Sequence, residues 1–226
     1  KHQQEHNAFK LYAQMQEESI CPDEWTFVAC VQACASLASK EESTRQISLE
    51  IGRALHANAR RKGFEARIYV SNALISMYGK CGNIPAAENV FRRMLEHDII
   101  SLNALLSVYV EQGQENLALQ FYLQMHSKGL VPDVMGLATA LQACGDFVDR
   151  EEPFVLKGSS TKYIFLKIGR ALHADALLKG FDSNMFVRST LISMYSRCGK
   201  IIEAENVFLK APKQDVVMQC HAFCLS

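Results

Sequence analysis

The chain has 226 residues, of which 49% are hydrophobic and 21% are charged, and its 24 basic residues are balanced by 24 acidic ones. This composition excludes a disordered or collagen-like chain, and no apolar run approaches the roughly 18 to 20 residues that a membrane span needs. Formal neutrality also means that the strongly basic balance typical of a nucleic-acid-binding domain is missing. The eight cysteines are too few for a disulfide scaffold in a chain of this length, so we expect them to be reduced.

Internal repetition is the most informative feature of the sequence. Residues 51–64 read IGRALHANARRKGF and residues 168–181 read IGRALHADALLKGF, which match at 11 of 14 positions with an offset of 117. With the same offset, residues 72–91 match residues 189–208 at 13 of 20 positions. A large unit is therefore duplicated in the chain.

The upstream part of this unit recurs with a shorter offset. Residues 22–34 are echoed by residues 132–144 with an offset of 110, so the second copy contains seven extra residues downstream of that segment. We interpret 35–50 and 145–167 as lengthened loops. The second is expected to be solvated or mobile because it contains Pro153, Gly158 and a Ser-Ser-Thr run. The alternative is that its apolar residues dock on the flank of the fold, namely Phe154, Val155, Ile164 and Phe165.

Apolar residues spaced i, i+3, i+4 and i+7 predict pairs of short helices. In 99–133, the first stripe is Leu102, Leu105, Leu106 and Tyr109, and the second is Ala118, Phe121, Tyr122 and Met125. We expect the first helix to end at Gly113 and the second at Gly129 and Pro132. The second stripe recurs as Ala87, Val90, Phe91 and Met94, and again as Ala204, Val207, Phe208 and Ala211. A two-helix unit cannot bury its own stripe, which predicts an all-α solenoid with a groove lined by the first helices.

The spacing and the residues of these units resemble a known family. The segment 99–133, IISLNALLSVYVEQGQENLALQFYLQMHSKGLVPD, has 35 residues and resembles a pentatricopeptide repeat throughout. The 31-residue segments resemble its short variant, and the segments with IGRALHA resemble its long variant. The predicted order is a partial P unit (1–23), an L unit (24–67), an S unit (68–98), a P unit (99–133), an L unit (134–184), an S unit (185–215) and a truncated P unit (216–226). This order resembles the plant PLS subclass, which implies a right-handed α-solenoid of stacked helix-turn-helix repeats.

The resemblance implies sequence-specific binding of single-stranded RNA in mitochondria or chloroplasts, usually to define a site of C-to-U editing. One base is read per repeat, chiefly by the fifth and the last residue of that repeat. Carried onto this sequence, the base-reading pairs are Asn72 with Asp98, Asn103 with Asp133, and Ser189 with Asp215. The second residue of each repeat is implied to pack against base faces, and this set is Tyr69, Ile100, Met135, Phe186 and Val217.

The L units depart from this code. Their fifth residues, Val28 and Ala138, have no hydrogen-bonding side chain, and their last residues are Arg67 and Asn184. We therefore predict little base selectivity at the L units. With RNA running 5′ to 3′ along the N-to-C direction, the predicted core is unread, U, U, unread, G.

Plainer structural roles exist for the same residues. Asp98, Asp133 and Asp215 each lie just before a predicted helix, where an acidic residue can cap the helix and interact with its dipole. Capping and base reading are compatible roles. Asn72 and Asn103 can also be ordinary surface amides, and Tyr69 and Phe186 can be partly buried core residues.

No constellation in the sequence predicts catalysis, a cofactor or a metal site. The Cys-His-x-x-Cys stretch at 220–224 has no second ligand pair, and His56 and His173 are repeat equivalents that packing explains. Phosphate-binding glycine loops and the H-x-E with P-C-x-x-C pattern of a zinc deaminase are absent. We therefore expect no enzyme, and a deaminase or editing factor would act in trans or lie beyond Ser226. Any targeting peptide is likewise expected to lie outside this sequence.

The main alternative function is a protein-binding scaffold of the tetratricopeptide type. That family is also an all-α solenoid, but it has uniform 34-residue units with a W-x-x-L-G-x-x-Y motif. The units of this chain have mixed lengths and lack that motif. The neutral charge of the chain remains the best argument against RNA binding.

Overall fold

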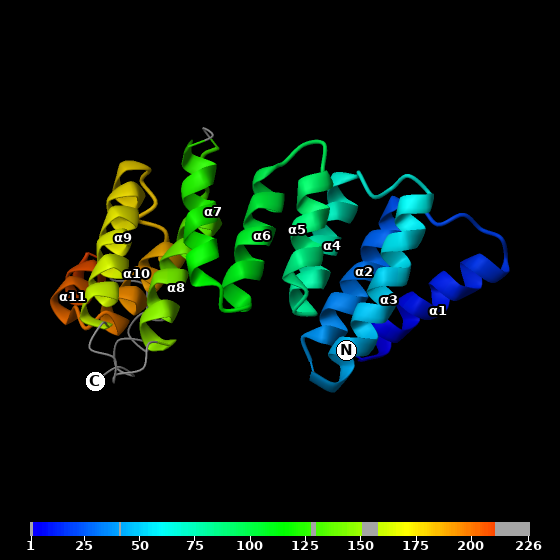
Figure 1. Ribbon diagram of the computed structural model, residues 1–226, viewed down its shortest axis with the longest axis horizontal. Coiled ribbons are helices and arrows are strands. Elements are labelled where there is room, and N and C mark those ends of the chain that lie inside the picture. Colours follow the sequence, from blue (N-terminus) through cyan, green and yellow to red (C-terminus); the bar gives the residue numbers. More distant parts are fainter. Residues whose placement is uncertain (1, 41, 128–129, 151–157, 211–226) are drawn as a thin grey trace. The chain divides into compact units, whose positions relative to one another are not determined.

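The computed structural model describes residues 2–40, 42–127, 130–150 and 158–210. Across these residues all regular structure is α-helical, and the chain divides into two compact units, residues 1–112 and 113–226 (Figure 1). Unit 1 contains α1 (His2–Glu17), α2 (Glu24–Ala38), α3 (Glu42–Arg61), α4 (Ile68–Lys80), α5 (Ile84–Arg93) and α6 (Ile99–Glu111). Unit 2 contains α7 (Glu115–Ser127), α8 (Val134–Arg150), α9 (Gly158–Leu178), α10 (Met185–Arg197) and α11 (Ile201–Leu209).

Polar side chains cap the N-termini of several helices, where the first backbone N–H groups have no partner within the helix. Asp23 accepts from the backbone N–H of Thr26 at 2.8 Å at the start of α2. Asn83 caps α5, and Asn184 caps α10 by accepting from Phe186 and Val187. A side-chain acceptor at this position typically contributes about 1 kcal/mol to stability.

Glycines in the left-handed region follow the ends of α4, α6 and α10. In α6, Glu111 is the last helical residue, and Gly113 follows with a φ of 67°. Gly82 has a φ of 74° after α4. Because a Cβ disfavours this conformation, glycine is the residue that allows the chain to turn back into the second helix. The predicted end of the first helix at Gly113 is confirmed.

The helices pack as the apolar stripes predict. In unit 1 the first helices α2, α4 and α6 pack side by side, with α3 against α2 and α5 against α4. In unit 2, α8 packs on α10, while α9 packs against α8 and α11 packs against α10. The stripe residues in the described part of the chain are buried except for half-buried phenylalanines, namely Phe91, Phe121 and Phe208. Each unit therefore buries its core between stacked helix pairs.

A glycine inside the IGRALHA motif allows its helix to approach the next helix of the chain closely. A Cβ on Gly52 of α3 would lie 2.5 Å from the Met77 sulfur of α4. At the equivalent place of the second copy, a Cβ on Gly169 would lie 2.7 Å from the Met194 sulfur. Glycine inside a helix costs about 1 kcal/mol relative to alanine, and here it makes room for a buried methionine. The duplication has preserved this contact in both units.

The interpretation of 35–50 and 145–167 as lengthened loops is wrong for most of the described residues, which are helical. In the first copy α2 continues to Ala38 and α3 begins at Glu42. In the second copy α8 continues to Arg150 and α9 begins at Gly158, while residues 151–157, with Phe154 and Val155, lie outside the described residues. Phe165 is buried and stacks on Phe147 with ring centroids 3.7 Å apart, whereas Ile164 is half exposed. Within the described residues, α8 and α9 thus reach into the predicted loop segment and pack against each other.

No helix in the described part of the chain is both long and apolar enough to cross a membrane.

Candidate functional site

The first helices of unit 1 line a groove of about 350 Å³. We call it groove 1, and its lining residues are Trp25, Val28, Gln32 and Ala35 of α2, Tyr69, Asn72, Ala73 and Ser76 of α4, and Ile100 and Ala104 of α6. Apart from the adjacent Asn72 and Ala73, neighbouring lining residues on each helix are three or four positions apart, so each helix presents one continuous face to the groove. Three residues predicted to read or sandwich bases, Tyr69, Asn72 and Ile100, are thereby brought together.

Asn72 is the half-buried polar residue of groove 1. Its Oδ1 atom is buried and has no hydrogen-bond partner among the described residues. A buried polar atom without a partner typically costs about 1 to 3 kcal/mol. A 180° turn of the carboxamide presents either its donor or its acceptor to the groove, and a polar ligand would satisfy it.

The predicted sandwiching residues of unit 1 are exposed apolar side chains, so the alternative of partial core residues does not describe them. Tyr69 is 52% exposed and Ile100 is 58% exposed. Tyr69 contacts Trp25, with ring centroids 5.1 Å apart and an interplanar angle of 33°. Trp25, which is 60% exposed, was missed by the sequence reasoning. The signal was available, because Trp25 is the second residue of 24–67 just as Tyr69 is of 68–98.

Unit 2 has a second groove, of about 170 Å³, between α8 and α10. We call it groove 2, and it is lined by Leu141, Gln142, Gly145, Ser189, Thr190, Ser193, Met194 and Arg197. The Ser189 hydroxyl donates to the Phe186 backbone carbonyl at 2.9 Å, which leaves its oxygen as an acceptor. Met135 and Phe186, the second residues of the predicted units 134–184 and 185–215, are 50% and 48% exposed.

The acidic residues predicted to read bases are helix caps in the structure. Asp98 accepts from the backbone N–H of Ser101 at 2.7 Å, and Asp133 accepts from that of Gly136 at 2.9 Å. Asn103 is half-buried on α6 of unit 1, and Asp133 belongs to unit 2. Asp215 and Val217 lie outside the described residues. Capping fixes the position of Asp98 and Asp133 at the start of the next first helix.

Five of the six described cysteines are buried, and Cys21 is exposed. Burial raises the pKa of the Cys30 thiol to about 11 and that of Cys34 to about 12. Thiols with such pKa values are poor nucleophiles at neutral pH. No group of three or more His, Cys, Asp or Glu side chains within the described ranges is placed to hold a metal ion. The Cys-His-x-x-Cys stretch at 220–224 lies outside those ranges.

His56 belongs to a buried polar network. Its Nδ1 lies 2.8 Å from the Tyr78 hydroxyl, and its Nε2 lies 3.0 Å from Glu65 Oε1. The repeat-equivalent His173 has its Nδ1 3.0 Å from the Tyr195 hydroxyl. Burial lowers the pKa of both histidines. Packing and hydrogen bonding thus account for both residues.

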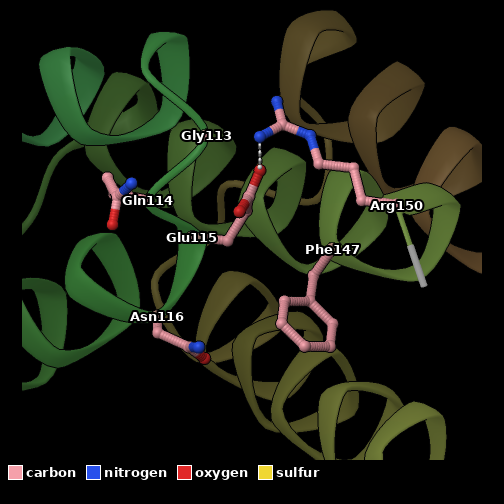
Figure 2. A pocket seen from close by; sticks show the side chains of 6 residues that line it. All are labelled: Gly113, Gln114, Glu115, Asn116, Phe147 and Arg150. Atoms are coloured by element: carbon pink, nitrogen blue, oxygen red, sulfur yellow. Dashed lines mark ion pairs between the residues drawn. The ribbon is translucent and has the colours of Figure 1, made fainter. Parts of the chain in front are cut away.

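A third pocket, of about 280 Å³, lies between the start of α7 and the end of α8. Figure 2 shows Arg150 reaching Glu115, and the two form an ion pair with an Nη1–Oε1 distance of 3.0 Å. Glu115 is 5% exposed, and the ring of Phe147 flanks the pocket. Because a buried carboxylate needs a counter-charge, Arg150 stabilises Glu115 and connects the two helices.

Comparison with protein families identifies repeats in this chain. The model described as PPR repeat matches residues 69–99 and 186–216, and the model described as pentatricopeptide repeat domain matches residues 95–147. The first two matches begin one residue after the units predicted at 68–98 and 185–215.

Similar proteins cover nearly the whole chain. A putative pentatricopeptide repeat-containing protein of Arabidopsis thaliana is 32% identical over 214 residues, which are 95% of this chain and 27% of that protein. A chloroplastic one from the same plant is 30% identical over 93% of this chain and 35% of its own length. A mitochondrial one is 30% identical over 94% of this chain and 18% of its own length. The chain therefore spans about a third or less of these relatives.

Solved structures have the same fold. The pentatricopeptide repeat protein PPR10 from maize matches with a TM-score of 0.63 and 20% identity, over 96% of this chain and 29% of that protein. PPR10 in complex with an 18-nt psaJ RNA element matches with a TM-score of 0.62 and 14% identity, over 95% and 27%. The predicted fold class, an all-α solenoid of stacked helix-turn-helix repeats, is thus confirmed. The chain matches pentatricopeptide repeat models over 69–147 and 186–216 and is similar along nearly its whole length to pentatricopeptide repeat-containing proteins.

Proposed function

We propose that this chain is part of a plant PLS-type pentatricopeptide repeat protein that binds single-stranded RNA in a sequence-specific manner. The RNA lies along the faces of the first helices, in grooves 1 and 2. Asn72, Asn103 and Ser189 contact bases, with Asp98, Asp133 and Asp215 as the second member of each pair. The second residues of the repeats, Tyr69, Ile100, Met135, Phe186 and Val217, pack against base faces.

The observation that carries this proposal is the composition of groove 1. Exposed apolar side chains flank a carboxamide whose oxygen has no hydrogen-bond partner in the described part of the chain. Stacking on an aromatic side chain contributes roughly 1 to 3 kcal/mol per base. A nucleobase offers both a flat face for Tyr69 and a polar edge for Asn72. The resemblance to PPR10, solved in complex with RNA, supports the same ligand class.

The biological setting is proposed from the relatives. Names of similar proteins include the words chloroplastic and mitochondrial, which favours an organellar protein. Within the organelle, the PLS-like order of units favours marking a site for RNA processing or C-to-U editing. This stretch has no catalytic role in that proposal, so a deaminase or editing factor supplied in trans or by another part of the protein performs the chemistry.

The test is fluorescence anisotropy with two labelled single-stranded RNAs. One carries the core N-U-U-N-G, in which N faces an L unit, and the other has both uracils changed to adenine. We expect at least a tenfold preference for the first, which corresponds to about 1.4 kcal/mol. Affinity should fall with salt, because each phosphate contact adds about 0.7 to the log–log slope for single strands.

Single variants connect the preference to the groove. Asn72→Ala and Asn103→Ala should each weaken binding of the uracil RNA by about 1 to 3 kcal/mol, the usual value of a good polar base contact. Asn89→Ala is the matched control, because Asn89 is exposed on the second helix α5. Equal binding of both RNAs would contradict sequence-specific reading. Absence of RNA binding at low salt would favour the protein-binding scaffold.

A further inference from the structure

Groove 1 and groove 2 hold the same polar pair at equivalent places of the duplicated sequence. Gln32 and Ser76 line groove 1, and Gln142 and Ser193 line groove 2. The glutamines are related by the offset of 110 residues and the serines by the offset of 117. In each copy, a carboxamide from the first helix of the L unit therefore faces the same groove as a hydroxyl from the first helix of the S unit.

The fifth residues of the L units cannot supply a polar contact. Val28 is apolar, and Ala138 is 1% exposed on α8. Gln32 follows Val28 by four residues, and Gln142 follows Ala138 by four, which places each glutamine one turn further along the same helix face. Both glutamines are exposed. Among the residues that α2 and α8 contribute to the grooves, these two carry the carboxamides.

We propose that Gln32 and Gln142 contact the nucleobases that face the two L units, each together with the serine opposite. This inference rests on the proposed RNA binding. It assigns a polar side chain to each of the two bases that the apolar fifth residues of the L units cannot recognise. A carboxamide donates and accepts through one planar group, which suits the edge of a base, and a hydroxyl completes the contact directly or through water. Gln142 Nε2 donates to Asp146 Oδ2 at 3.3 Å, and its Oε1 is thereby oriented as an acceptor.

The experiment uses single-stranded RNAs with the core N-U-U-N-G. Four RNAs vary the first N and four vary the second, and anisotropy gives the Kd of each. The wild-type chain should show at least a threefold spread of Kd among the four bases at each N. Gln32→Met keeps the length of the side chain and removes the carboxamide, so it should abolish the spread at the first N and retain it at the second. Gln142→Met should do the reverse.

Controls separate this inference from the proposed function. Gln46→Met changes an exposed glutamine on the second helix α3, outside the grooves, and should leave both spreads unchanged. Urea unfolding of each variant confirms that the fold is retained. A wild-type chain that binds all four bases equally at both N positions, while still preferring uracil over adenine at the central pair, would overturn the inference alone. A uniform loss of affinity in Gln32→Met would also overturn it, since this indicates a backbone contact. Loss of the central uracil preference would overturn the proposed function.

Discussion

Asp98, the residue before α6, has two predicted roles that the sequence could not separate. Asp98 was interpreted both as a helix cap and as a base reader. The structure establishes the cap, since the carboxylate accepts from the Ser101 backbone N–H. The same hydrogen bond holds the side chain at the start of α6, so the two roles can be distinguished only by a substitution that preserves one of them.

Asp98→Asn is that substitution. Asparagine caps helices about as well as aspartate, so the free energy of unfolding should change by less than about 0.5 kcal/mol, whereas Asp98→Ala should lose about 1 kcal/mol. If the carboxylate also contacts RNA, Asp98→Asn should reduce the preference for uracil over adenine severalfold, because an amide adds a donor where only an acceptor stood. Urea unfolding and RNA anisotropy measure the two effects separately. An unchanged preference would leave Asp98 as a cap alone.

At the scale of elements, the extension of α8 and α9 is the main departure from the sequence interpretation. Pro153, Gly158 and a Ser-Ser-Thr run favoured a loop, yet α9 begins at Gly158 and continues to Leu178. Tertiary packing overrides these local signals, because Phe165 of α9 stacks on Phe147 of α8 at an interplanar angle of 9°. In the described residues, the ends of α8 and α9 nearest the predicted loop therefore contribute helical packing.

Phe165→Ala should therefore destabilise the chain. Removing a buried phenylalanine side chain typically costs about 3 to 5 kcal/mol, and we expect the lower end because Phe147 is only half-buried. Tyr163→Ala is the matched control, since Tyr163 is 53% exposed on the same helix. Urea unfolding should show a loss of about 3 kcal/mol for Phe165→Ala and less than about 1 kcal/mol for Tyr163→Ala. Similar losses in both variants would contradict a structural role for the stack.

At the scale of the whole molecule, the duplication has placed the same buried network in both units. His56 contacts Tyr78 in unit 1, and His173 contacts Tyr195 in unit 2. In unit 1 the network includes Glu65, which also pairs with Arg60 at 2.7 Å and with Arg93 at 3.5 Å. Hydrogen bonding to Arg60 is the main cause that lowers the pKa of Glu65 to about 2.

This network predicts a pH dependence of stability. Burial lowers the pKa of His56 and His173 below the ordinary value of 6.5, so the unfolded chain binds more protons than the folded chain just below pH 6.5. The contribution to stability is therefore present above pH 6.5 and is lost as pH falls through 6.5 toward the folded pKa values. Glu65 remains ionised throughout this window.

Urea unfolding at pH 7.5, 6.5 and 5.5 measures this effect. The wild-type free energy of unfolding should decrease on acidification, and the double variant His56→Gln/His173→Gln should show a smaller decrease. The other histidines remain in the variant and serve as an internal reference. If the free energy of unfolding fell equally with pH in the wild type and the double variant, the buried histidines would not be the cause of the pH dependence.

The sequence by itself determined the repeat architecture and the residues on the inner faces of the first helices. The stripe through Leu102, Leu105 and Leu106 predicted a buried helix face, and the structure confirms it. Helix faces and helix ends can be predicted from the sequence because they are determined by residues only a few positions apart in the chain. The placement of Tyr69 and Asn72 on one helix face follows from the same periodicity.

Only the tertiary structure decided how residues from different helices meet. It brings Trp25 of α2 against Tyr69 of α4, places Gln32 and Ser76 in one groove, and continues helix through segments with loop signals. These contacts depend on the distance between helices, which is determined by close approaches such as Gly52 against Met77. A periodic pattern indicates which face of a helix is buried, but the side chains that share a groove are determined by how closely neighbouring helices pack.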